Sequence, residues 1–148
     1  MGASHFTGPI VSGPILNTSG TTVGQDVADW GVLIAGQTMA IDQASTTAVS
    51  TSIVIPAYSV ITAINVIVST NWTGTITVGT SATATELVAT GPTLNIGAVA
   101  CPPTTQANAL LWANTGANDV RIFVKAGSTG SGVGTLVVAY LQAENVTT

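Results

Sequence analysis

The sequence is short of charge, and above all of basic residues. Of its 148 residues, two are Lys or Arg and six are Asp or Glu, so charged residues make up 5% of the chain, against about 25% in ordinary soluble domains. Two cations cannot neutralise a run of phosphates, which argues against nucleic acid as a partner. A basic helix lying on a membrane surface is excluded for the same reason.

Cysteine and long apolar runs are equally scarce. The single cysteine, Cys101, excludes an intramolecular disulfide and any metal site built from several cysteines. No run of about 18 apolar residues is present, so the sequence predicts no helix that spans a bilayer. Residues 1–20 have neither a basic segment nor a continuous apolar segment, so we expect no secretory signal and synthesis in a cytosol.

The chain is instead rich in β-branched residues. Val, Ile and Thr account for 55 of the 148 residues. These side chains are stiff at χ1 and pack well on a pleated surface. The hydrophobic fraction of 46% excludes a disordered chain, and 16 glycines supply turns. The composition therefore predicts an all-β domain.

Alternating polarity predicts eight or nine strands, most of them separated by short turns that contain Gly or Pro. Residues 85–90 fit either a strand or a helical turn, and the Gly/Ser/Thr-rich residues 127–134 are predicted to form a hairpin loop. The expected strands after the N-terminal region are residues 31–41, 46–55, 60–68, 75–78, 109–113, 120–125 and 135–142. The predicted fold is a jelly roll or β-sandwich of about eight strands over residues 26–148.

Residues 60–68 carry apolar side chains on both faces of the expected strand. Strict alternation predicts that Val60 and Ile64 share one face and that Ile61 and Ile67 share the other. Both faces should then be covered, as in a central strand of a sandwich or at a contact between subunits.

Residues 1–25 differ from the rest, because two Gly-Pro steps stand among apolar residues. Proline cannot donate to a strand ladder, so we expect an extended N-terminal arm that lies across another surface, such as a neighbouring subunit. Trp72, in a predicted turn, is a candidate anchor of the same kind, with core packing as the alternative. The candidate interface residues are Phe6, Pro9, Ile10, Val11, Pro14, Ile15 and Trp72.

No group of residues predicts catalysis, a cofactor or a metal. The single histidine, His5, stands near the terminus without a partner in reach, and no charged residue lies within ten positions of Cys101 to activate its thiol. Asp26 and Asp29 fit a cap or helical turn better than a metal site. The glycine-rich residues 127–134 lack the Gly-Lys-Ser/Thr ending of a phosphate-binding loop.

A surface with so few charges suits lasting contact, because little has to be desolvated when it is buried. A free monomer normally covers itself with charge. The composition therefore favours a permanent component of an assembly, and homo-oligomers with closed symmetry are the usual form of such components.

The sequence resembles the capsid decoration, or cement, proteins of tailed bacteriophages. The stretches that carry the resemblance are residues 5–12 (HFTGPIVS), 53–64 (IVIPAYSVITAI), 76–81 (ITVGTS) with 86–88 (ELV), and 134–141 (GTLVVAYL). Many members have Gly where this chain has Tyr58. The resemblance implies a jelly-roll domain, commonly a homotrimer, that sits on the outside of the virion and clamps neighbouring major capsid protein subunits, with an N-terminal arm that reaches a neighbour.

Three other functions remain open. One is an unrelated self-assembling β protein, which should polymerise alone without a capsid. A head-fibre, tail or adsorption protein would bind host carbohydrate through exposed aromatic side chains, so the position of the tryptophans separates it from a decoration protein. An enzyme would need a pocket that brings His5 close to Asp26 or Asp42.

Overall fold

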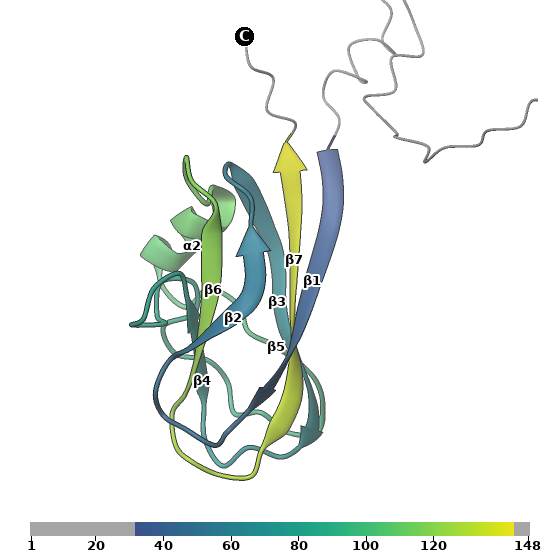
Figure 1. Cartoon of the computed structure of the whole chain (residues 1–148), viewed down its shortest axis with the longest axis vertical. Helices are drawn as coiled ribbons and strands as arrows, with labels where there is room; N and C mark the ends of the chain where they lie inside the picture. The colour runs from purple at the N-terminus through teal and green to yellow at the C-terminus, as the bar shows by residue number, and fades with distance from the viewer. Residues whose placement is uncertain (1–31, 144–148) are drawn as a thin grey trace, which may run out of the picture. The chain divides into compact units, whose positions relative to one another are not determined.

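The computed structural model describes residues 32–143, which form seven strands and one helix arranged as two sheets (Figure 1). Sheet A has the strand order β1-β7-β3-β5, and sheet B has the order β2-β6-β4. The elements are β1 (Val32–Asp42), β2 (Val49–Ile55), β3 (Ser59–Thr70), β4 (Ile76–Gly79), β5 (Gly97–Ala100), α2 (Gln106–Ala113), β6 (Val120–Ala126) and β7 (Val133–Ala143). The predicted all-β sandwich is confirmed; the predicted arm of residues 1–25 lies outside the described residues.

The strands pair in the nested order of a jelly roll. The first strand, β1, lies beside the last, β7; β2 pairs with β6, and β3 pairs with β5. The innermost pair is β4 with the chain at Val88, which meets Val78 in a single antiparallel bridge. Such nesting arises when one long antiparallel hairpin rolls up into two sheets. The eighth strand is thus reduced to one bridge, and residues 85–90 form neither a regular strand nor a helical turn.

A bulge in β3 overturns the face assignment expected for residues 60–68. The register between β3 and β7 shifts between Ile61 and Ala63, and one extra residue reverses which side chains face the core. Ile61 and Ile64 are therefore both buried, whereas Val60 is 39% exposed and Ile67 is 54% exposed. The expectation that Val60 and Ile64 share a face is wrong. One face of β3 is left partly exposed in the single chain, so its coverage at a contact between subunits stays a prediction.

The strand predicted for residues 109–113 is instead part of the helix α2. Its N-cap is Thr105, whose hydroxyl accepts a hydrogen bond from the backbone N–H of Asn108 at 3.1 Å. A short apolar run does not by itself distinguish a strand from a helix. Asn108 and Trp112 lie one turn apart on one helix face. The Asn108 amide donates to the carbonyls of Thr85 and Glu86, and Trp112 Nε1 donates to that of Leu87.

The glycine-rich residues 127–134 do not form a hairpin loop, which corrects the prediction. They connect β6 in sheet B to β7 in sheet A, and these two strands do not pair. The chain therefore crosses from one sheet to the other here. Polar, flexible composition predicts a loop, but it does not say whether the flanking strands are neighbours.

Tyr58 has a backbone conformation that normally belongs to glycine. Its φ is 57° in the turn between β2 and β3, and this left-handed region is costly for a residue with a Cβ. The turn is held by a hydrogen bond of 2.7 Å from the Tyr58 N–H to the carbonyl of Gly116.

Candidate interaction surface

The outer face of sheet A is the largest continuous surface built from regular strands on the described chain. Residues that stand directly opposite each other in a ladder share a face, so the register defines its members. Val60 stands opposite Leu141, and Ile67 stands opposite Thr135 on one side and Ala98 on the other. The other outward members of the ladder are Ala63, Asn65, Ala100, Val137 and Ala139, and β1 adds Gly36, Thr38 and Ala40.

This face carries no charge across its interior. The four strands of sheet A contain one charged residue, Asp42, which is the last residue of β1. Asp42 stands at the corner of the sheet, where its Oδ1 accepts a hydrogen bond of 3.0 Å from the N–H of Ala44. The carboxylate therefore caps the next turn. The rest of the face consists of Ala, Val, Ile, Leu, Thr, Gly and Asn residues.

The outer face of sheet B, by contrast, carries charged side chains. Arg121 and Lys125 both lie on β6 and are exposed, while Ile122 and Val124 between them are buried. The half-solvated alternation predicted for residues 120–125 is confirmed. Arg121 Nη1 donates a hydrogen bond of 2.7 Å to the carbonyl of Thr51. The outer face of sheet B thus has the charges that a water-facing sheet normally shows, and the outer face of sheet A lacks them.

Side chains from sheet A close the free edge of β2. The Gln37 amide on β1 pairs with the backbone of Val54 as a strand would: its Oε1 accepts from the Val54 N–H at 3.1 Å, and its Nε2 donates to the Val54 carbonyl at 2.6 Å. Gln37 Nε2 also donates to the Tyr140 hydroxyl at 2.9 Å. The Ser52 N–H contacts Met39 Sδ at 3.2 Å. This edge is therefore already paired and offers little to an incoming strand.

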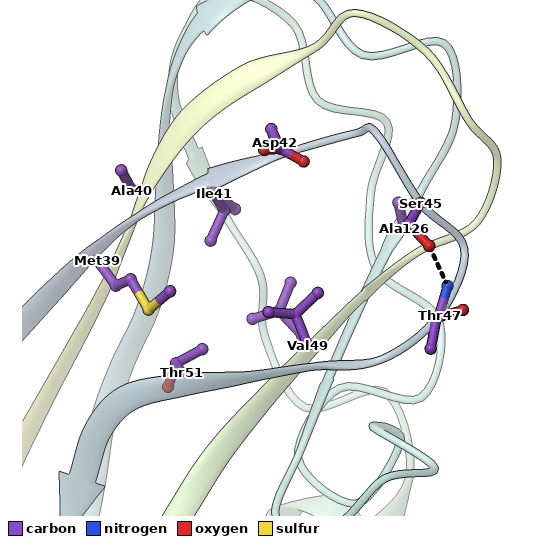
Figure 2. A pocket seen from close by; sticks show the side chains of 10 residues that line it. Met39, Ala40, Ile41, Asp42, Ser45, Thr47, Val49, Thr51 and Ala126 are labelled. Carbon is purple, nitrogen blue, oxygen red and sulfur yellow. Dashed lines mark hydrogen bonds between the residues drawn. The ribbon is translucent and has the colours of Figure 1, made fainter.

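A small pocket lies where β1 and β2 diverge (Figure 2). Met39 and Ile41 on β1 face Val49 and Thr51 on β2 across it, and its volume is about 130 Å³. Asp42 is the one carboxylate in its lining. A cavity of this size has room for one small apolar group.

Glu86 holds the loop between β4 and Val88. Burial opposes its ionisation, but hydrogen bonds from the hydroxyls of Ser81 and Thr83 and from the Thr80 N–H more than compensate and lower its pKa from 4.5 to about 2. The hydrogen bonds that the Glu86 carboxylate accepts come from residues of the same loop. We therefore assign Glu86 to loop structure.

Glu86→Gln is expected to remove part of the acid sensitivity of the fold. A carboxyl whose folded pKa lies below its unfolded pKa stabilises the protein above about pH 4.5 and loses that contribution as the pH falls towards 2. The difference in urea midpoint between wild type and Glu86→Gln should therefore be largest at neutral pH and shrink towards pH 2. A difference that stays constant over this range would contradict the lowered pKa.

The residues predicted from sequence to form the interface are not those of the sheet A face. Phe6, Pro9, Ile10, Val11, Pro14 and Ile15 lie outside the described residues. Trp72 is 3% exposed and belongs to the hydrophobic core, so its interpretation as an exposed anchor is wrong and the alternative of core packing holds. Trp112 is half-buried through its bond to the 85–88 segment. The face itself could have been found only by knowing the bulge in β3.

The other candidate groups offer little chemistry. Cys101 is buried, and burial raises the pKa of its thiol to about 11, so it is protonated at neutral pH. Within residues 32–143, no three His, Cys, Asp or Glu side chains gather closely enough to hold a metal ion. His5, Asp26 and Asp29 lie outside this range.

The described part of the chain contains no helix with the length and apolar character that a membrane crossing requires. Compared with family models, with curated proteins and with solved structures, the chain matches none of them.

Proposed function

We propose that this protein is a structural component of a virion: a decoration protein that binds the outside of a tailed-phage capsid and strengthens contacts between major capsid protein subunits. The observation that carries the proposal is the outer face of sheet A, which is broad, largely apolar and free of charge except at the Asp42 corner. A face of this kind stays buried in the working state of a protein.

The physical logic is linkage. A protein that binds the assembled shell and not its separated subunits stabilises the shell by mass action. When several copies act together, the later contacts become intramolecular, and weak contacts sum to lasting attachment. Small uncharged side chains suit this role because their burial costs little desolvation. None of these steps requires catalysis.

The carbohydrate-binding alternative gains no support from the described tryptophans. Sugar binding needs aromatic ring faces exposed to solvent in a concave loop region. Trp72 is buried in the core. Trp112 packs against the 85–88 segment, and its indole N–H donates a hydrogen bond to the Leu87 carbonyl. Neither side chain is arranged to stack on a sugar.

The proposal is tested by sedimentation of the full chain with capsid shells assembled from the coat protein of the phage that encodes it. The chain should pellet with intact shells at a fixed ratio that saturates, and it should stay in solution with unassembled coat subunits. Saturated shells should also dissociate at a higher temperature than bare shells. Absence of the chain from the pellet at a large molar excess would overturn the proposal.

A further inference from the structure

We propose that the free edge of β5 is a docking site for a short extended segment of another protein, which would join the four-stranded sheet A as an added strand. The edge runs along the side of the sheet and is separate from its outer face, so the inference goes beyond the proposed function. Strand addition takes its affinity from main-chain hydrogen bonds, so the partner is defined first by its extended backbone.

The outward hydrogen-bonding groups of β5 belong to Ala98 and Ala100. The N–H of Cys101 donates to the carbonyl of Ile64 at 2.8 Å, so these two opposite residues form a hydrogen-bonded pair of the antiparallel ladder. Such pairs alternate with pairs whose N–H and C=O groups point away from each other, and the register places Ala98 and Ala100 in the second class. The N–H and C=O groups of both alanines therefore point away from β3.

Nothing in the described part of the chain pairs with this side of β5. The strand is the last in the order of sheet A, and among residues 32–143 no hydrogen bond reaches the outward groups of Ala98 and Ala100. Gly97, Ala98 and Ala100 are exposed, and a Cβ built on Gly97 would meet no atom within 4 Å. The edge is therefore open to a partner.

The edges of sheet B are protected, which distinguishes them from the edge of β5. Gln37 pairs with the backbone of β2, as described above. Beside β4, the N–H groups of Ala89 and Thr90 both donate to the hydroxyl of Thr104, at 3.2 and 3.3 Å. β5 has none of the usual protections, because it contains no Lys, no Pro and no bulge. The open edge thus marks β5 as the strand that accepts a partner.

The flanks of β5 limit the partner to a short segment. The next outward position after Ala100 is Pro102, which has no N–H to donate. The outward position before Ala98 is Ile96, whose N–H already donates to Asn71 Oδ1 at 2.7 Å. The ladder is therefore confined to the four residues of β5 and pairs with a segment of about the same length.

The side chains of β5 favour a partner with bulky residues over a second copy of this strand. Ala98 and Ala100 are small, so large β-branched or aromatic side chains of an added strand have room beside them. A second β5 would place Gly and Ala against this row, and such pairs contribute least across a ladder. Residues 87–118 contain no charged residue, so the partner segment needs no complementary charge.

The test is amide hydrogen exchange of the isotope-labelled full chain, followed by nuclear magnetic resonance. In the free chain, the amides of Ala98 and Ala100 should exchange rapidly, whereas the Val99 amide, which faces β3, should exchange slowly. The probe is the peptide acetyl-Lys-Thr-Val-Thr-Ile-Thr-Val-Lys-amide, an extended segment with an uncharged middle. At saturation it should slow the exchange of Ala98 and Ala100 by about tenfold or more.

Ala100→Pro removes one outward N–H and leaves the ladder with β3 intact, because proline is tolerated at edge positions whose N–H faces solvent. It should weaken peptide binding by about fivefold, the effect of one lost main-chain hydrogen bond. Ala100→Ser is the matched control, because it keeps the N–H and should bind as the wild type does. A peptide with N-methylated interior amides tests the same bonds without altering the protein, and it should not bind.

The inference is overturned if Ala98 and Ala100 are already protected in the free full chain, which would show that residues 1–31 or a second copy cover the edge. It is also overturned if the peptide leaves their exchange unchanged, or if folded Ala100→Pro and Ala100→Ser proteins bind the peptide equally. Protection that appears at Val137 on β7 instead would place the peptide on the outer face of sheet A and contradict the site at β5.

Discussion

Trp72→Ala is expected to lower the free energy of unfolding by about 3–5 kcal/mol, the usual cost of removing a large aromatic side chain from a core. The Trp72 ring is 3% exposed and lies against the backbone of Gly132, where an added Cβ would come within 2.4 Å of the ring. The ring therefore fills the space beside Gly132, and its removal leaves a cavity there. Urea unfolding followed by circular dichroism measures the loss.

The matched variant is Trp72→Phe. The Nε1 atom of Trp72 is buried without a hydrogen-bond partner in the described structure, so its removal loses no bond and relieves a desolvation cost. We expect most of the stability to be kept. Trp112→Phe provides the contrast, because it removes the bond of 3.0 Å to the Leu87 carbonyl. A loss below about 1 kcal/mol for Trp72→Ala would show that Trp72 is not a core residue.

Gln43→Met is expected to cost about 2–4 kcal/mol, since it removes several hydrogen bonds at once from a fully buried site. The Gln43 amide donates to the hydroxyls of Thr73 and Ser128 and accepts from the Thr73 N–H, all at 3.1 Å. Its backbone N–H donates to Gly132, and its carbonyl accepts from Gly130. One residue thus joins three loops at the end of the sandwich.

Methionine nearly preserves the volume of Gln43, so the loss reports on hydrogen bonds more than on a cavity. The control is Gln106→Met at the start of α2, where the side chain is exposed and the expected change is within about 0.5 kcal/mol. Equal denaturant midpoints for the two variants would mean that the Gln43 bonds contribute nothing net to stability.

The sequence predicts strands well where one face is wet and the other is buried. The alternation of Val120, Ile122 and Val124 with Arg121 and Lys125 is confirmed. The two charged residues stand four positions apart and so share the solvent-facing side of the strand. Composition predicted the all-β class, and the spacing of strands and turns predicted the sandwich.

Alternation along the sequence does not predict structure where the decisive contact is with a residue far away in the chain. The bulge in β3 follows from pairing with β7, residues far away in the chain, so simple alternation assigned Val60 to the wrong face. α2 depends on its Thr105 cap and on Asn108 reaching the 85–86 carbonyls. Trp72 is buried, and its ring packs against Gly132, a residue far away in the chain that no short window of sequence contains.

The closed edge of β2 has a consequence for crowding. Most sheet proteins keep their open edges from joining one another with lysines, prolines or bulges, yet this chain has two basic residues in all. Gln37 and Met39 fill the bonding positions of β2 from within the molecule. At high concentration, a strand of another copy therefore meets an edge of β2 that is already paired, although the chain has few lysines to repel it.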